Sequence, residues 1–215
     1  MLETATGRYS SQRSQGVSLG DIQQNLSTML FDMTSRDGSV FSWIQQMLQM
    51  RILETDRLVL RQFCQDDLRD LNTWEEAPGE RYTALQAQSL LDFCFQSYRK
   101  WGMGPWGMLL KKDRMMVGNC GFCRIDFKHN CGEVNYYVAR QYRGQGLASE
   151  ALKAVLEFGF EHIGLARIQA RCGPDNISSE RVMQKAGMQF ERMISTETTK
   201  GEFRDEKLYA IARDL

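Results

Sequence analysis

The sequence lacks an excess of charge of either sign. Its 215 residues include 27 Lys or Arg and 27 Asp or Glu, so there is no global basic field to attract nucleic acid or an anionic membrane. It also lacks any apolar run near the roughly 20 residues that span a bilayer. Its N-terminus does not show the charged-then-apolar pattern of a secretion signal. We therefore expect a cytoplasmic protein that binds neither nucleic acid nor membrane.

Histidine is scarce as well. The chain has only His129 and His162, and no ligand spacing surrounds either of them. A metal site draws on clustered His, Cys, Asp and Glu, and a Ser-His-Asp triad needs a positioned histidine. We therefore expect no metal and no histidine-dependent triad.

The six cysteines have irregular spacings that do not indicate a disulfide framework. One pair, Cys120 and Cys123, has the C-x-x-C spacing of redox and zinc motifs. A redox pair needs a helix that starts at the first cysteine, whereas residues 115–117 and 124–126 are typical of a strand. Residues three apart in a strand point to opposite faces, so the two sulfurs should diverge. We expect the cysteines to be reduced and mostly buried.

The composition changes near residue 50. Residues 1–49 are rich in Ser, Gln, Thr and Gly, and two stretches, 22–33 and 40–50, could form short amphipathic helices. The remainder, 50–215, has the length of one ordinary domain. Residues 1–49 would be either a poorly defined or weakly helical extension, or sequence upstream of a natural start at Met50.

Hydrophobic periodicity predicts alternating strands and helices after residue 50. In 84–100, for example, Leu91, Cys94 and Tyr98 follow helical spacing. Hairpins followed by a β-α-β-α run indicate an α/β fold, with one mixed sheet of about six to seven strands and helices on both faces. The expected helices are 66–76, 84–100, 146–162 and 176–186, and the expected strands are 57–63, 106–112, 115–126, 133–139, 166–172, 187–195 and 203–212.

Two glycines, Gly144 and Gly146, lie where a predicted strand ends and a predicted helix begins. Glycine lets the backbone turn sharply and approach a ligand closely. The first turn of the helix presents unpaired N–H groups at the positive end of its dipole, which suits a pyrophosphate. Arg143 adds a nearby cation.

Several interpretations of this turn compete. The chain has no G-x-x-x-x-G-K-[ST] sequence, which excludes the Walker A loop, and Ser149 stands where the Rossmann G-x-G-x-x-G needs its third glycine. The strands before the turn also do not form a leading βαβ unit. An acetyl-CoA-binding turn and a plain tight turn with incidental glycines remain, and for a lone G-x-G the plain turn is favoured.

The surrounding residues favour the acetyl-CoA turn. The stretch 132–151 resembles the first motif of the GNAT superfamily of N-acetyltransferases, in which a strand leads into [RQ]-x-x-G-x-[GA]; Gln141, Gly144 and Gly146 match it. Further on, 175–188 is similar to the second motif, N-x-x-S-x-x-x-x-x-K-x-G-F. Four of its positions match, and Met188 replaces the usual Phe: the matching residues are Asn176, Ser179, Lys185 and Gly187.

Two further segments, 55–61 and 98–106, are similar to the RimJ/RimL-type branch, the ribosomal-protein N-acetyltransferase-like family. The resemblance covers about residues 51–212. It implies a splayed mixed sheet that holds acetyl-CoA in a V-shaped opening, with no metal. The implied acetyl-CoA-binding residues are Tyr136, Val138, Gln141, Arg143, Gly144, Gln145, Gly146, Leu147, Ala148, Ser149 and Asn176, and the backbone N–H groups from Arg143 to Ala148 would hold the pyrophosphate.

Acetyl transfer needs a neutral amine, whereas an alkyl ammonium has a pKa near 10, so a base must remove a proton. Glu133 is the candidate base, Asn135 could help to hold a water, and Ser179 is the candidate donor to the leaving sulfur. Glu133 could instead be a solvated surface residue, and Ser179 could simply bond within its helix. A catalytically silent acyl-CoA-binding module on the same fold is the alternative function.

The expected acceptor is a primary amine, either a small molecule or a protein N-terminus. It should lie between the first two helices and the final hairpin, which flank the thioester end. Here the sequence departs from the branch, because the usual segment between Trp74 and Ala84 looks shortened. The expected assembly is a monomer or a homodimer.

Overall fold

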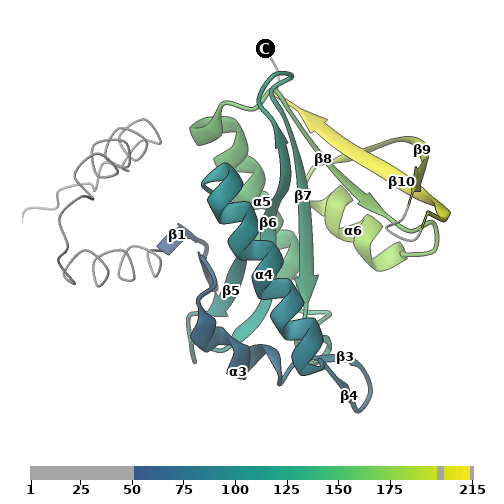
Figure 1. The fold of residues 1–215 in the computed structure, drawn as a ribbon. Helices are drawn as coiled ribbons and strands as arrows, with labels where there is room; N and C mark the ends of the chain where they lie inside the picture. Colours follow the sequence, from purple (N-terminus) through teal and green to yellow (C-terminus); the bar gives the residue numbers. More distant parts are fainter. Residues whose placement is uncertain (1–50, 198–200, 214–215) are drawn as a thin grey trace, which may run out of the picture. The chain divides into compact units, whose positions relative to one another are not determined.

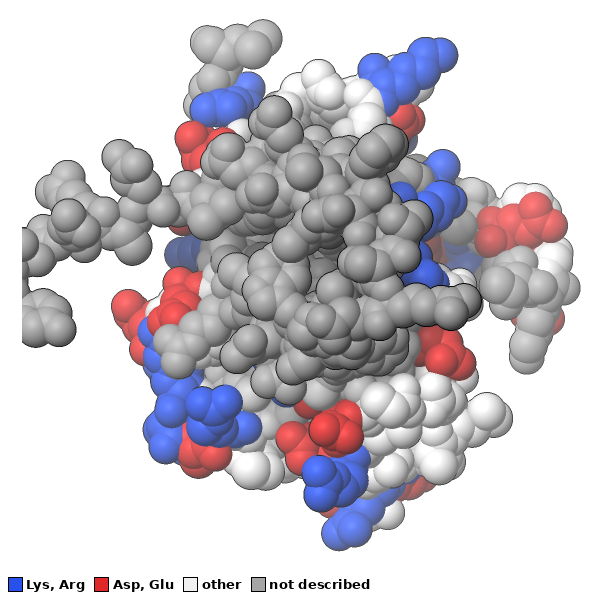
Figure 2. All heavy atoms as spheres, turned by 60° about the vertical axis from the view of Figure 1, so that its left-hand side comes forward, with Lys and Arg blue, Asp and Glu red and all other residues white. Residues whose placement is uncertain are grey.

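The computed structural model describes residues 51–197 and 201–213 (Figure 1). The helices expected at 22–33 and 40–50 lie outside the described residues, as does the whole extension 1–49. Among the described residues, no helix is both long and apolar enough to cross a membrane. The described side chains visible in Figure 2 carry both signs of charge in close neighbourhood, in keeping with equal numbers of acidic and basic residues.

The described residues form a large mixed sheet, a small hairpin and a set of helices. The large sheet has eight strands in the order β1-β2-β5-β6-β7-β8-β10-β9, and β3 pairs with β4 separately. The strands are β1 Arg51–Glu54, β2 Leu58–Arg61, β3 Glu75–Ala77, β4 Glu80–Arg81, β5 Pro105–Leu110, β6 Met116–Asp126, β7 Cys131–Val138, β8 Arg167–Cys172, β9 Gln189–Glu197 and β10 Phe203–Ala212. The helices are η1 Gln65–Asp67, α3 Leu68–Leu71, α4 Ala84–Trp101, η2 Arg140–Tyr142, α5 Leu147–Phe158, the π-helix η3 Gly159–Ile163 and α6 Ile177–Lys185.

Helices cover both faces of the large sheet, as predicted. On one face, α3 and α4 bury a cluster that includes Leu91 and the strand residues Leu109 and Met116. On the other face, Trp106 of β5 packs edge-on against Phe158 of α5, with ring centroids 5.4 Å apart. Figure 1 shows α4 in front of the strands and α5 behind them. The predicted α/β fold is confirmed, and β1 adds a strand to the expected sheet.

A single parallel pair, β7 with β8, interrupts the antiparallel pattern of the sheet. Their register runs from Cys131↔Arg167 to Glu133↔Gln169 and then stops, although β7 continues to Val138 and β8 to Cys172. On its other edge β7 stays paired with β6 as far as Val138. The two strands therefore diverge, and the second half of β7 keeps one edge that β8 does not use.

The helix expected at 66–76 is wrong in its second half. Helix α3 ends at Leu71, and Glu75 already belongs to β3. The reason is Trp74, which is fully buried and donates a hydrogen bond from Nε1 to the carbonyl of Met116, 2.8 Å away. This tertiary contact outweighs local helix propensity.

The helix expected at 146–162 also changes before its end. Regular α-helix stops at Phe158, and one π-helical turn continues to Ile163. Gly159 at this change packs tightly, because a Cβ there would lie 2.6 Å from Ile168 and 2.7 Å from Phe122. Close packing of the helix on the sheet therefore coincides with the change in hydrogen-bond pattern.

The six cysteines are free thiols in the structure, and Cys94, Cys120 and Cys172 are buried. Burial raises the pKa of Cys94 to about 12, and burial, followed by the charge of Glu133, does the same for Cys123. At neutral pH both are uncharged thiols, which are poor nucleophiles and poor metal ligands. No group of three or more potential metal ligands occurs among the residues that the structure describes.

Candidate active site

The glycine turn joins the free end of β7 to α5. Gly144 has φ +79° and Gly146 has φ +78°, a left-handed conformation that side chains with a Cβ rarely adopt. A Cβ at Gly144 would have no neighbour within 4 Å, and one at Gly146 would meet only Arg57 Nη2 at 3.7 Å. Backbone conformation, not lack of space inside the protein, is therefore what requires glycine here.

The backbone N–H groups of 144–149 form a cluster of unused donors at the start of α5. None of them donates to another described residue. The N–H of Arg143, by contrast, donates to the carbonyl of Arg140 at 3.1 Å. The sequence analysis expected the pyrophosphate-binding N–H groups to begin with that of Arg143. This is corrected, because the N–H of Arg143 is used at the end of η2, and the available donors start at Gly144.

Two side chains of the motif bind the protein itself. Arg143 Nε donates to the carbonyl of Val138 at 2.8 Å, and its guanidinium lies 5.4 Å from the centre of the Tyr137 ring. Gln141 donates to the carbonyl of Thr73 at 3.1 Å and accepts from the N–H of Glu75 at 3.3 Å. The side chain of Gln141 therefore ties the turn to the segment after α3.

Helix α6 begins next to the edge of β8, at the sequence of the second motif. Asn176 caps it through Oδ1, which accepts from the N–H of Ser179 at 3.0 Å and from the hydroxyl of Ser178 at 2.9 Å. Because Oδ1 must accept, the orientation of the amide is fixed. Its NH₂ group has no partner among the described residues and is available to a ligand.

Ser179 and Tyr136 connect α6 with β7. The Tyr136 hydroxyl lies 2.6 Å from Ser179 Oγ and 3.0 Å from the carbonyl of Ser179. Burial raises the pKa of Tyr136 well above its usual value, and the hydrogen bond with Ser179 offsets this only in part. The pair is therefore neutral at physiological pH and holds a hydroxyl proton.

Glu133 is buried, with 8% of its surface exposed, so it is not a solvated surface residue. Its Oε1 accepts from Arg171 Nε at 2.8 Å and also from Nη2 of the same guanidinium, and its Oε2 accepts from Gln169 Nε2 at 3.2 Å. Arg171 Nη1 also reaches Glu206 at 3.4 Å. Burial alone would lower the pKa of Arg171, but the bonds and charges of Glu133 and Glu206 outweigh it and raise that pKa.

Asn135 lies two residues after Glu133 and therefore on the same face of β7. Its Oδ1 is buried and accepts no hydrogen bond from the described residues. An unpaired buried acceptor costs about 1–3 kcal/mol, which favours a ligand or water that donates to it. Tyr136, the residue after Asn135, points to the opposite face, toward Ser179.

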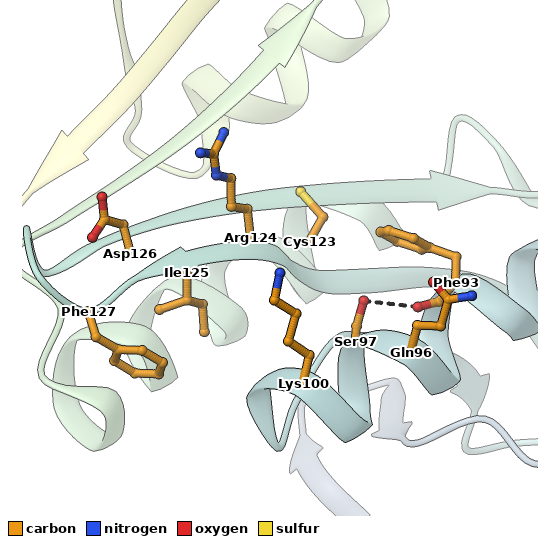
Figure 3. A pocket seen from close by; sticks show the side chains of 9 residues that line it. All are labelled: Phe93, Gln96, Ser97, Lys100, Cys123, Arg124, Ile125, Asp126 and Phe127. Atoms are coloured by element: carbon orange, nitrogen blue, oxygen red, sulfur yellow. Dashed lines mark hydrogen bonds between the residues drawn. The ribbon is translucent and has the colours of Figure 1, made fainter. Parts of the chain in front are cut away.

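A hollow of about 680 Å³ lies between the C-terminal half of α4 and the end of β6 (Figure 3). Figure 3 shows Lys100 of α4 pointing toward β6, with Arg124 on that strand beyond it. The β6 wall adjoins Glu133, because Arg124 is its register partner and Cys123 Sγ donates to its carbonyl at 3.4 Å. The lining residues are Phe93, Gln96, Ser97, Lys100, Cys123, Arg124, Ile125, Asp126 and Phe127.

The site therefore has three parts. They are the unused N–H donors at the turn before α5, the edge of β7 that β8 does not use, and the start of α6, which Asn176 caps. The model of the acetyltransferase (GNAT) domain matches residues 57–189, more than half of the chain, and this range contains every one of these parts. The chain belongs to the GNAT acetyltransferase family. It is an enzyme of that family, and its described residues form a single GNAT domain.

Individual proteins that resemble this acetyltransferase support the family assignment. It is 31% identical to the uncharacterized N-acetyltransferase YoaA of Bacillus subtilis over 66% of this chain and 85% of the relative. It is 29% identical to the ribosomal-protein-serine acetyltransferase of Escherichia coli, over 51% of this chain and 61% of that one. Mycobacterium smegmatis RimJ, solved with CoA-disulfide, aligns with a TM-score of 0.58 at 25% identity, covering 72% and 81% of the two chains. The predicted likeness to the RimJ/RimL-type branch is confirmed.

Residues that the motifs did not indicate also belong to the acetyltransferase's turn. Arg57 and Thr55, from the connection between β1 and β2, bind Glu150 in the first turns of α5, and Arg57 binds the carbonyl of Gln145. The sequence predicted a strand over 57–63 and a family likeness over 55–61, but no role in the turn. Nothing in the spacing of these residues relates them to Glu150, because the partners are more than 90 positions apart.

Proposed function

We propose that this acetyltransferase moves the acetyl group of acetyl-CoA directly to a primary amine. The observation that carries the proposal is the run of unused N–H donors at 144–149, at the positive end of α5. Such a group of donors suits a pyrophosphate, and it lies at the end of the strand whose second half is unpaired with β8. The solved RimJ complex, which carries a CoA derivative on a related fold, supports the same ligand.

The remaining cofactor contacts follow from the same geometry. The edge of β7 at Tyr136 and Val138 that β8 does not use offers backbone groups to the amides of the pantetheine arm, as an edge strand does to a peptide, although the carbonyl of Val138 already accepts from Arg143 Nε. The NH₂ of Asn176 can donate to a pantetheine carbonyl from the other side. The backbone of Gly144, Gln145 and Gly146 and the N–H groups of Leu147, Ala148 and Ser149 would hold the pyrophosphate.

Glu133 is the proposed proton acceptor. A carboxylate has about four lone-pair sites, and the contacts with Arg171 and Gln169 leave room for one further donor. Asn135 Oδ1 can accept from the same water or amine. Glu133 takes one proton from the ammonium group, directly or through water, which leaves the amine neutral. The amine nitrogen then attacks the thioester carbonyl carbon, the C–N bond forms and the C–S bond breaks, and the second nitrogen proton goes to the departing thiolate.

Ser179 is the proposed donor to the departing sulfur. Its hydroxyl lies at the start of α6, held by Tyr136, on the opposite side of β7 from Glu133. A hydrogen bond from Ser179 stabilises the thiolate, which then takes a proton and leaves as the free thiol of CoA. The proposed base and the proposed donor therefore lie on the two faces of β7.

The hollow beside α4 is the proposed approach for the acceptor. It opens on the face that carries Glu133 and Asn135, and it is bordered by β6 next to Glu133. The sequence placed the acceptor between the first two helices and the final hairpin; of these, α4 lines the hollow, and no residue of β9 or β10 is among the lining residues. The names of the relatives disagree about acceptors, since one acts on a ribosomal protein and another on tubulin, so the proposal stops at a primary amine.

The test has two parts. Acetyl-CoA should raise the melting temperature of the protein, because it binds the native state and not the unfolded chain. A panel of amines should then reveal at least one that releases free CoA thiol at a rate above the no-enzyme control. If millimolar acetyl-CoA leaves the melting temperature unchanged, the proposed cofactor is wrong. If acetyl-CoA raises the melting temperature but no amine causes release of CoA thiol, the protein is a silent acyl-CoA-binding protein.

A further inference from the structure

A set of polar contacts ties the connection between β1 and β2 to both sides of the glycine turn. Arg57 Nη1 donates to the carbonyl of Gln145 at 2.9 Å, and Arg57 Nε and Nη2 each lie 2.6 Å from Glu150 Oε2. Glu150 Oε1 also accepts from the N–H of Arg57 at 2.9 Å and from the Thr55 hydroxyl at 2.5 Å. Gln145 precedes Gly146 and Glu150 follows it, so the contacts enclose the turn.

The turn itself has few means of holding its shape. Gly144 and Gly146 have no side chains, and a Cβ at either would touch at most the Arg57 guanidinium. Glycine also has the widest choice of backbone conformations, so fixing it costs more entropy than fixing other residues. The contacts from Arg57 to Gln145 and Glu150 are the ones that fix the peptide between Gln145 and Gly146 relative to α5.

The carboxylate at the centre of this network is held as an anion. Burial would raise the pKa of Glu150, but the Thr55 hydroxyl, the N–H of Arg57 and its guanidinium together lower it. Its charge therefore persists at neutral pH. Because Glu150 lies in the first turn of α5, its attachment also sets the direction of the helix start relative to β2.

We propose that Arg57, together with Thr55 and Glu150, is a positioning residue that pre-forms the pyrophosphate-binding turn. It does so by holding the carbonyl of Gln145, so that the N–H groups from Gly146 onward point outward before the cofactor arrives. The inference rests on the proposed use of acetyl-CoA. Its effect is on binding, because pre-organisation removes an ordering cost that the ligand would otherwise meet.

The experiment compares Arg57→Gln with wild type on three acetyl donors of decreasing length: acetyl-CoA, acetyl-dephospho-CoA and acetyl-pantetheine. The KM for the first two should rise by on the order of tenfold with kcat nearly level, since only the pyrophosphate depends on the turn. The kcat/KM for acetyl-pantetheine, which has no pyrophosphate, should stay at the wild-type value. Arg57→Lys should not rescue the loss, because a single ammonium cannot bridge a carbonyl and a carboxylate as a planar guanidinium does.

Arg213→Gln is the matched control. The Arg213 side chain is as exposed as that of Arg57, at 48%, and it also bridges a carbonyl and a glutamate. These belong to Phe160 and Glu161 in η3, beyond the end of α5 that is opposite the turn. Arg213→Gln should leave all three donors unaffected. Glu150→Gln combined with Arg57→Gln should weaken acetyl-CoA binding by less than the sum of the single changes, as coupled partners do.

Three outcomes would overturn the proposal. An equal loss with acetyl-pantetheine would show general damage to the fold, and a loss confined to acetyl-CoA would assign Arg57 to the 3′-phosphate instead. Unchanged KM values in Arg57→Gln would show that the turn holds its shape without the contacts of Arg57 with Gln145 and Glu150. Failure of wild type to bind acetyl-CoA would defeat the proposed function itself and is recognised before any variant is made.

Discussion

At the scale of single residues, Glu133 is both a proposed base and half of an ion pair. Arg171 occupies one of its oxygens and Gln169 the other, and little water reaches the carboxylate. A buried ion pair is weak evidence for stability, because desolvation offsets much of the attraction. Its position beside the orphaned Asn135 Oδ1 is the better argument for a role in chemistry.

We predict that Glu133→Gln lowers kcat by about 10²–10⁴-fold, the usual contribution of general-base catalysis, with acetyl-CoA affinity level. The loss should shrink as pH rises, because more of the acceptor amine is then already neutral. Arg171→Gln is the control, since it removes the same ion pair but keeps the carboxylate. It should be slowed far less, because the proposed proton acceptor is still present in this variant.

Equal slowing and equal loss of melting temperature in the two variants would assign the pair to structure alone. A full-rate Glu133→Gln with the wild-type profile would shift the role of base to a water held by Asn135 and backbone carbonyls. Either result leaves the family assignment in place, because that depends on the match over 57–189.

At the scale of elements, the start of α6 separates capping from ligand binding within one side chain. Asn176 Oδ1 caps the helix, while its NH₂ has no partner in the described part of the chain and is proposed to donate to the pantetheine. We predict that Asn176→Asp keeps the melting temperature, because an aspartate oxygen can cap equally well and its charge suits a helix N-terminus. It should nevertheless weaken acetyl-CoA binding several-fold, by the loss of one hydrogen bond worth about 1 kcal/mol. Calorimetric titration measures it.

Asn176→Ala provides the comparison, since it removes both functions. It should lose about 1 kcal/mol of stability as well as the affinity. An Asn176→Asp variant with wild-type affinity would limit Asn176 to its capping role.

The elements also show what sequence patterns can and cannot predict. Helix α4 was predicted within one residue because its signals are local: Thr83 and Gln86 form a capping box and the apolar residues keep helical spacing. The early end of α3 could not be predicted, because it depends on Trp74 reaching a carbonyl 42 residues away. The same distinction holds in the site. The first motif predicted the position of the turn. The contacts of Gln141 with Thr73 and of Arg57 with Gln145 could not be predicted, because they join segments far apart in the chain.

At the scale of the whole molecule, we propose that residues 50–215 are the catalytic domain and fold without 1–49. All eight strands of the large sheet begin at or after Arg51, and the family match begins at residue 57. A chain that starts at Met50 should therefore unfold cooperatively and bind acetyl-CoA with nearly the wild-type affinity. Circular dichroism and calorimetry of the two chains are the measurements. An insoluble or unfolded shorter chain would show that the extension stabilises the domain.

The β7–β8 pair has a consequence for how this family can evolve. Parallel neighbours need a crossover connection, and here the crossover is the glycine turn together with α5. The segment that we propose to bind the cofactor is thus also the covalent connection between these two strands. A descendant that lost catalysis would still need this connection to build its sheet, so we expect its turn to outlast its activity. The topology does not require Glu133 or Asn176, so we expect substitutions at these residues to appear earlier than changes in the turn.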